Sequence, residues 1–347
     1  MTFIFALTLT LLLSGLFLTI RPKALLAQDI SSPNRQSTET SETGRAKYIH
    51  LPRVTTETTP EEIVNHPAFY GFGRLVLPLE GSRRPPNTPL LISLANMLPY
   101  HYNVSPNQAA EALNHMIDQV ARGRILFYDL YTDKEKKERP QLEATGLFFF
   151  EGNPYAPTAI ICAGGGFVYV GSIHEGFPHA MKLNKKGFNA FVVKYRVDSE
   201  LEACQDLARA IELAFKLSEE LKISMEGYSL WGSSAGARLA AHLGSEGTLA
   251  YGARELPKPR AVIMAYTGHS ELSIVDPPTF AVVGEDDAIS DPLVMRRRIN
   301  GLKKAGVPTE FHVFPNTRHG FGLGVGTKAE GWLDLATNFW QKQLEGK

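Results

Sequence analysis

The sequence predicts an α/β fold with a mostly parallel, doubly wound sheet of about eight strands and helices on both faces. Two observations carry this prediction. Short runs that are apolar at every position, such as TAIICAGG and AVIMAYTG, are typical of central parallel strands buried on both faces. Helical patterns alternate with these runs along residues 125–347, as expected when crossover helices connect parallel strands.

The charge and cysteine content narrow the range of partners and cofactors. Lys plus Arg and Asp plus Glu each number 36 in the 347 residues, so the formal net charge is zero. Without a basic excess, we expect no nucleic-acid partner. Cys162 and Cys204 are too few for a metal cluster and are expected to be small buried side chains; nothing in the sequence supports a disulfide between them.

The first 47 residues are predicted to precede the folded part. Residues 1–27 begin with an uncharged apolar stretch, which we interpret as a signal peptide cleaved after Ala27 or, alternatively, as a membrane anchor that inserts residues 3–20. A cleaved signal would make the protein secreted, either periplasmic or extracellular. Residues 28–47 carry almost no apolar side chains and are expected to be a disordered linker.

Residues 48–124 are expected to form an extension that packs on the core or over the entrance of the site. Its clearest element is a helix in NVSPNQAAEALNHMIDQVARG. Ser105 is the expected N-cap, Pro106 the first helical residue, and Gln108 completes a capping-box pattern.

The core is expected to open with a hairpin of ILFYDLYT and ATGLFFFE, joined by the charged segment DKEKKERPQ, which adds an antiparallel edge. A long helix follows, with Leu201, Cys204 and Phe215 on its apolar side. The other helices are expected in AGARLAAHLGS, PLVMRRRINGLKKAG and GWLDLATNFWQKQL. The later strands are expected in TAIICAGG, NAFVVKYRV, YSLWGSS, AVIMAYTG, TFAVVGEDD and EFHVFPNT. Ligands of such sheets bind at the carboxyl ends of the strands, so the residues that follow each strand are the site candidates.

Ser234 is the candidate nucleophile, in the stretch SLWGSSAGARLAAHL. The pattern Gly-x-Ser-x-Gly is met by Gly232, Ser234 and Gly236, whereas neither residue two positions from Ser233 is glycine. A strand before the pattern and a helix after it indicate a sharp turn, in which larger side chains at the glycine positions would clash. The turn sets the hydroxyl at a helix N-terminus, where the dipole and free N–H groups favour negative charge.

Three glycines in ICAGGGFVYVG, at the end of another expected strand, are the candidate oxyanion hole. We expect the N–H groups of Gly165 and Gly166, together with that of Ala235, to stabilise a developing negative charge. The alternatives are a flexible loop and a phosphate-binding turn. The second alternative is weak because the segment has neither Gly-Lys-Ser/Thr nor Gly-x-Gly-x-x-Gly.

His319 and Asp287 are the candidate base and its orienting carboxylate. A serine hydroxyl is a poor nucleophile until an imidazole removes its proton. His319, in PNTRHGFG, follows the last expected strand and precedes the last helix. The preceding strand ends in AVVGEDDAISDP, where we prefer Asp287 to Asp286, and the alternative is a solvated acidic turn.

These segments make the chain resemble α/β-hydrolases of the esterase/lipase group. The resemblance rests on CAGGGFVYVGSIHEGFPHA, AFVVKYRV, LWGSSAGARLAAHL, VVGEDDAISDP and RHGFGLGVGTKAEGW, within residues 125–345. The chain is most similar to the carbohydrate-esterase-like branch related to acetyl-xylan and feruloyl esterases, and to hormone-sensitive-lipase-type esterases. The order Ser234, Asp287, His319 is the order of the triad in this fold. One departure is Ala163, which stands where the lipase-type motif often has histidine.

The resemblance implies hydrolysis of short acyl esters, including acetylated carbohydrates, through an acyl-serine intermediate without cofactor or metal. Phe167 is a candidate acyl wall, with core packing as the alternative. His174 and Glu175 are expected either to contact the leaving group of the substrate or to hold the glycine loop, and Tyr266 to face the pocket. Two other functions stay open: a serine peptidase of the prolyl-oligopeptidase type, for which the chain has no room for a propeller, and a non-catalytic hydrolase-fold binding protein.

Overall fold

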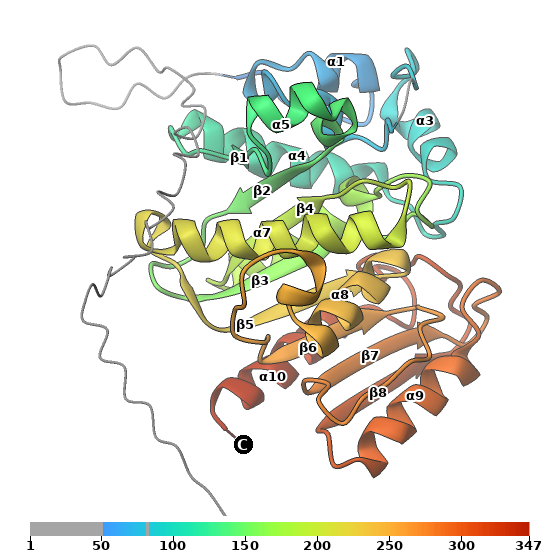
Figure 1. Cartoon of the computed structure of the whole chain (residues 1–347). Helices are drawn as coiled ribbons and strands as arrows, with labels where there is room; N and C mark the ends of the chain where they lie inside the picture. Colours follow the sequence, from blue (N-terminus) through green and yellow to red (C-terminus); the bar gives the residue numbers. More distant parts are fainter. Residues whose placement is uncertain (1–50, 81–82, 347) are drawn as a thin grey trace, which may run out of the picture. The chain divides into compact units, whose positions relative to one another are not determined.

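The computed structural model describes residues 51–80 and 83–346, which contain an eight-stranded sheet in the order β1-β2-β4-β3-β5-β6-β7-β8 (Figure 1). Strands β3 to β8 are parallel, and β1 and β2 add the expected antiparallel edge. The strands are β1 Phe127–Tyr128, β2 Gly146–Phe150, β3 Pro157–Cys162, β4 Asn189–Lys194, β5 Ser224–Ser233, β6 Ala261–Ala265, β7 Thr279–Gly284 and β8 Thr309–Phe314.

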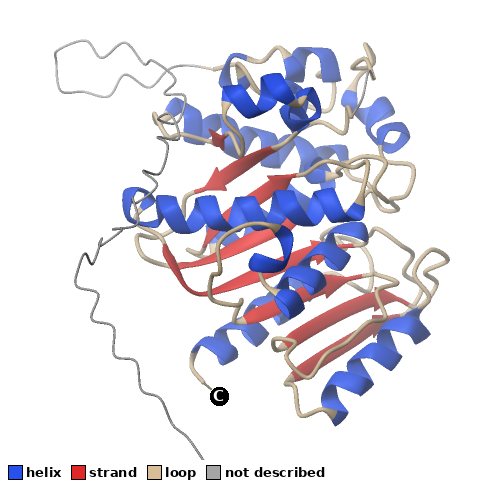
Figure 2. Ribbon diagram, in the orientation of Figure 1, coloured by secondary structure: helices blue, strands red, loops and turns tan. Residues whose placement is uncertain are grey.

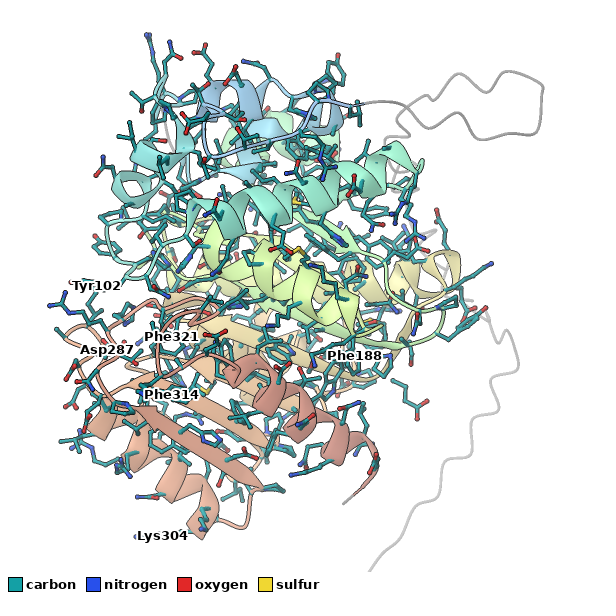
Figure 3. All side chains as sticks on the ribbon, turned by 180° about the vertical axis from the view of Figure 1, so that it is seen from behind. Tyr102, Phe188, Asp287, Lys304, Phe314 and Phe321 are labelled. Carbon is teal, nitrogen blue, oxygen red and sulfur yellow. The ribbon has the colours of Figure 1, made fainter. Side chains whose placement is uncertain are left out.

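Helices cover both faces of the sheet, as the sequence predicted (Figure 2). Helices α7 and α8 lie on the face seen in Figure 1, whereas α4, α6 and α10 lie on the face seen from behind in Figure 3. The helices are α1 Pro60–Val64, α2 Gly73–Val76, α3 Leu90–Met97, α4 Pro106–Ala121, α5 Asp133–Glu138, α6 Phe177–Lys185, α7 Glu200–Leu221, α8 Ala235–Glu246, α9 Pro292–Lys304 and α10 Trp332–Leu344. The prediction of an α/β fold with a doubly wound sheet is therefore confirmed.

The register of the central strands brings the candidate site segments to one edge. Cys162 at the end of β3 pairs with Gly232 of β5, and Gly232 pairs with Met264 of β6. Because the strands are parallel, the glycine loop after β3, the serine turn after β5 and the end of β6 lie side by side.

Three local expectations differ from the structure. The N–H of Gln108 donates to the hydroxyl of Ser105 at 3.3 Å, but the Gln108 side chain makes no return bond to the N–H of Ser105, so α4 has the expected N-cap without the full capping box. The charged segment after β1 contains helix α5, which a capping box between Thr132 and Glu135 begins, so the hairpin connection is helical. Leu201 is 58% exposed, because it lies in the first turn of α7 at the edge of the buried stripe centred on Ala203 and Leu207. Cys162 and Cys204 are buried free thiols, as expected.

The described part of the extension packs its apolar side chains into the same hydrophobic core as the sheet. The ring of Phe72 stacks on Phe127 with centroids 4.8 Å apart and meets the edge of Phe148 at 5.8 Å. A buried ion pair joins Lys194 of β4 to Glu80, and Glu80 also accepts the N–H of Val170. Side chains of the extension therefore continue the core over the β2–β4 side of the sheet.

The predictions for the N-terminus fall outside the described residues: the signal peptide or anchor in residues 1–27, the inserted segment 3–20 and the linker 28–47. In residues 51–80 and 83–346, no helix has both the length and the apolar character needed to cross a bilayer.

Candidate active site

The turn between β5 and α8 holds Ser234 in an unusual backbone conformation, with φ +50° and ψ −117°. A Cβ added to Gly232 would lie 2.3 Å from the carbonyl oxygen of Gly236, and one added to Gly236 would lie 2.1 Å from that of Cys162. Both glycines are therefore required by the sharpness of the turn. The N–H of Ser234 donates to the carbonyl of Ala265 at 2.8 Å, which anchors the turn to the end of β6.

The structure brings Ser234, His319 and Asp287 into one hydrogen-bonded line. The Nε2 of His319 lies 3.0 Å from the Oγ of Ser234, and its Nδ1 lies 2.8 Å from Oδ2 and 3.0 Å from Oδ1 of Asp287. The N–H groups of Ile289 and Ser290 donate to Oδ1 of Asp287 at 2.9 and 2.7 Å. The carboxylate is thus fixed by its own loop, while the imidazole connects it to the hydroxyl.

Asp287 is buried, whereas its neighbour Asp286 is exposed. Figure 3 shows Asp287 and Phe321 toward the same edge of the sheet as Tyr102, with Phe188 at the other end. Of the two aspartates that the sequence left as candidates, Asp287 is the one that reaches His319. The catalytic roles of the three residues stay predictions.

The glycine loop lies against the candidate nucleophile. A Cβ added to Gly164 would lie 2.8 Å from the Cβ of Ser234, and Gly165 and Gly166 have φ of +137° and +63°. Among the described residues, the N–H groups of Gly165, Gly166 and Ala235 have no hydrogen-bond acceptor. These three donors are therefore available to a ligand beside Ser234, as a candidate oxyanion hole requires.

Phe167 and Ala163 flank the glycine loop on its two sides. Phe167 is half-buried with φ +57°, next to the exposed Val168, and its assignment as an acyl wall stays a prediction. Ala163, which stands where the lipase-type motif often has histidine, is buried, and its carbonyl accepts the hydroxyl of Tyr195 at 2.6 Å. This hydrogen bond ties the start of the loop to the end of β4.

His174, Glu175 and Tyr266 lie behind the glycine loop, with exposures of 4%, 0% and 0%. The carboxylate of Glu175 accepts the N–H of Gly164 at 2.6 Å through Oε2 and the hydroxyl of Tyr266 at 2.7 Å through Oε1. His174 contacts the carbonyl of Gly320 through Nε2 at 2.9 Å. Their contacts are with the loops around Ser234, so the geometry favours holding the loop over contacting a leaving group.

The two buried ionisable groups behind the glycine loop, Glu175 and His174, both have lowered pKa values. Burial alone would raise the pKa of Glu175. The neighbouring His101 imidazole and the hydroxyl of Tyr266 lower it by more than burial raises it, so the net pKa is well below its usual range. Burial, with the nearby His101, lowers the pKa of His174 to about 4. Near neutral pH, Glu175 is therefore ionised and His174 uncharged.

The extension contributes residues to this site that the sequence analysis did not assign. The N–H of Tyr102 donates to the carbonyl of His319 at 3.1 Å, and a Cβ added to Gly166 would lie 3.1 Å from the ring of Tyr100. His101 reaches Glu175 with Nε2 at 3.1 Å from Oε1. In the sequence, the one feature that marks these residues is the aromatic and histidine cluster PYHYN. It has no helical or strand periodicity from which its position in the fold could be predicted.

Two hollows lie away from this edge, and neither is lined by a residue of the candidate triad. One of about 530 Å³ lies between α4, α6 and residues 53–56, and one of about 200 Å³ lies between α8, α9 and residues 269–276. No group of three or more histidine, cysteine or acidic side chains within the described ranges is arranged to hold a metal ion.

Comparisons with known proteins find one similar curated sequence and several similar solved structures. No family model matches the chain. It is 22% identical over 234 residues, 58% of its length, to an acetylxylan esterase from Xylanibacter ruminicola, and it spans about half (48%) of that relative. It is 25% identical to an acetyl ester-xyloside bifunctional hydrolase from Caldicellulosiruptor lactoaceticus, with a TM-score of 0.51, covering 57% of this chain and 88% of that one.

A further solved structure bears on the fold alone. It is a carboxylesterase from Lactobacillus plantarum, 20% identical with a TM-score of 0.51, and the match covers 57% of this chain and 92% of that one. The match covers 57% of this chain, so the remaining part is long enough to include the extension in addition to the shared core.

Proposed function

We propose that the chain is an α/β-hydrolase of the esterase-like branch and a carboxylic ester hydrolase in which Ser234 is the nucleophile. One observation carries the proposal: Ser234 Oγ lies 3.0 Å from His319 Nε2, while Nδ1 of the same ring lies 2.8 Å from Asp287. This arrangement lets the imidazole accept the serine proton while the carboxylate holds its tautomer and stabilises the imidazolium.

The reaction proceeds in two halves. Ser234 Oγ bonds to the ester carbonyl carbon as its proton moves to His319 Nε2, and the carbonyl electron pair becomes an oxyanion that faces the donors of the glycine loop. The intermediate collapses, the bond to the leaving oxygen breaks, and His319 protonates that oxygen to release the alcohol. Water then attacks the acyl-serine by the same proton transfers and releases the acid.

The oxyanion is stabilised by the N–H groups of Gly165, Gly166 and Ala235. Each is pre-positioned by the backbone, so no reorganisation is needed when charge develops. Losing one such donor costs roughly 3 kcal/mol of transition-state stabilisation.

The substrate class is a short acyl ester, with acetylated carbohydrates as the leading candidates. The names of the acetylxylan esterase and of the acetyl ester-xyloside hydrolase support this class. Aromatic side chains of a kind that packs against sugars lie beside the glycine loop and His319. Tyr100 and Tyr102 are 39% and 42% exposed, with one face of the Tyr100 ring stacked on Tyr169 and one face of the Tyr102 ring under Arg318. With residues 1–27 as an export signal, residues 48–124 as an extension and residues 125–347 as the catalytic domain, the enzyme works outside the cytoplasm on such esters.

The test is turnover of p-nitrophenyl acetate by the purified protein and two neighbouring variants. Ser234→Ala should abolish turnover, whereas Ser233→Ala keeps the fold and most of the activity. Unchanged turnover in Ser234→Ala would make the nucleophile assignment wrong. A wild-type protein that turns over no short acyl ester and takes no fluorophosphonate label would favour a non-catalytic binding protein. A panel of acetylated sugars and p-nitrophenyl esters of rising acyl length then defines the substrate.

A further inference from the structure

We propose that the N-terminal extension supplies a positioning residue to this active site: His101 acts through Glu175 on the glycine loop that receives the oxyanion. The inference rests on the proposed ester hydrolysis. It assigns a function to the extension, which reaches the catalytic edge through its segment Tyr100–Asn103.

His101 lies in a continuous line of hydrogen bonds. Its side chain is 2% exposed, its Nε2 lies 3.1 Å from Oε1 of Glu175, and its Nδ1 lies 3.0 Å from the hydroxyl of Tyr169. That hydroxyl accepts the N–H of Tyr100 at 3.1 Å. In this line Nε2–H donates to the carboxylate of Glu175, and Nδ1 and the Tyr169 hydroxyl share the second hydrogen bond.

Glu175 is where three parts of the chain meet. Its side chain is fully buried and accepts hydrogen bonds from His101 of the extension, from the N–H of Gly164 in the glycine loop and from the hydroxyl of Tyr266 after β6. A buried carboxylate needs such partners, because an unpaired charge in the interior is strongly destabilised. His101 is one of the three groups that keep the carboxylate ionised in this place.

Gly164 is closely packed between the Glu175 carboxylate and Ser234, so the position of the carboxylate affects the position of the reacting atoms. A Cβ added to Gly164 would lie 2.9 Å from Oε2 of Glu175 and 2.8 Å from the Cβ of Ser234, so carboxylate, loop and nucleophile are in contact. The next two residues, Gly165 and Gly166, carry the N–H groups proposed to face the oxyanion. A carboxylate that moves or turns would displace Gly164 and, with it, these donors.

The same segment of the extension also meets the loop of the candidate base. A Cβ added to Gly320 would lie 2.8 Å from the Cα of His101, and the side chain of Asn103 donates to the carbonyl of Val325 at 3.0 Å. The extension therefore contacts the loops on both sides of Ser234, which a peripheral addition to the fold would not do.

His101→Ala should lower kcat by roughly 10- to 100-fold, the range expected when a small displacement weakens donors to the transition state. KM should hardly change, because the oxyanion donors act mainly in the transition state. The matching readout is inhibition by benzeneboronic acid, whose boron bonds to Ser234 Oγ and becomes a tetrahedral anion. Its Ki should rise by the same factor by which kcat falls, an effect that a loss of folded protein alone would not produce.

Two further variants test whether His101 acts on the glycine loop through the carboxylate of Glu175. Glu175→Gln should reproduce the loss of kcat. The amide has only one oxygen, so it cannot accept hydrogen bonds from Gly164 on one side and from Tyr266 and His101 on the other. The double variant with His101→Ala should be no worse than either single variant. If His101→Ala does not fold, His101→Gln, which keeps a donor toward Glu175, should fold and show a smaller loss with the same parallel rise in Ki.

His66→Ala is the matched control. His66 is also a buried histidine of the extension, and its Nδ1 accepts the N–H of Ala68 at 3.1 Å, far along the chain from Glu175. It should lower stability without changing kcat or Ki. Equal losses of kcat in both variants, or a fall in kcat for His101→Ala without a rise in Ki, would overturn the inference alone. A wild-type protein with neither turnover nor boronate inhibition would overturn the proposed function, and the inference with it.

Discussion

Replacing Asp287 by asparagine should remove most of the activity while preserving the shape of the side chain. In the structure, Oδ1 of Asp287 accepts two backbone N–H groups, those of Ile289 at 2.9 Å and Ser290 at 2.7 Å, and Oδ2 faces Nδ1 of His319 at 2.8 Å. In the variant, these two donors hold the amide oxygen at the Oδ1 position. The amide NH₂ is then turned toward His319.

An NH₂ group facing Nδ1 forces that nitrogen to accept a hydrogen bond, so the proton of the neutral imidazole moves to Nε2. Nε2–H then points at Ser234 Oγ, 3.0 Å away, and the ring cannot take the serine proton. The expected loss of kcat is about 10⁴-fold, or about 5 kcal/mol of transition-state stabilisation. The assay is turnover of p-nitrophenyl acetate at neutral pH, with urea unfolding to check that the variant is folded.

Asp286→Asn is the control for this prediction. Asp286 is adjacent in sequence and exposed, and its substitution should leave kcat unchanged. The proposed role of Asp287 is wrong if Asp287→Asn keeps a tenth or more of the activity, or if Asp286→Asn shows the larger loss.

Two predictions concern stability and are read from urea unfolding. Burial lowers the pKa of His179 from 6.5 to about 4, so stability is full above pH 6.5 and falls by on the order of 3 kcal/mol as the pH drops toward 4. In His179→Phe, the free energy of unfolding should fall less steeply as the pH drops from 6.5 to 4. An unchanged pH dependence would contradict the attribution of this loss to His179. Lys194→Met leaves the buried Glu80 unpaired and should lower the unfolding free energy by about 3–5 kcal/mol. Adding Glu80→Gln should recover much of that loss; equal instability of single and double variants would argue against the ion pair.

The sequence was sufficient for the sheet and for the residues that follow its strands. Ser234, Asp287 and His319 each come after a buried apolar run, and parallel strands end at one edge, so local patterns alone predicted their meeting. Of the two adjacent aspartates, the structure buries Asp287 and exposes Asp286, while the catalytic role of Asp287 stays a prediction. Helix α5 was missed although its capping box, Thr132 with Glu135, was present in the sequence.

The contacts of the extension could not be predicted from sequence in the same way. His101 and Tyr169 are 68 positions apart, and neither belongs to a periodic run or a turn pattern that would bring them together. Their meeting depends on how the described part of the extension packs over the β2–β4 side of the sheet. For the same reason Glu175 was left between two roles, since its burial depends on that packing rather than on its neighbours in sequence.

The identity of the nucleophile is tested most directly by mapping the site of covalent labelling. The wild-type protein is treated with a fluorophosphonate, digested, and the peptide that contains residues 229–243 is sequenced by mass spectrometry. One adduct is expected on Ser234 and none on Ser233, and the Asp287→Asn variant should be labelled much more slowly than the wild-type protein. An adduct on Ser233, or labelling of another residue with Ser234 unmodified, would contradict the assignment of Ser234 as the nucleophile.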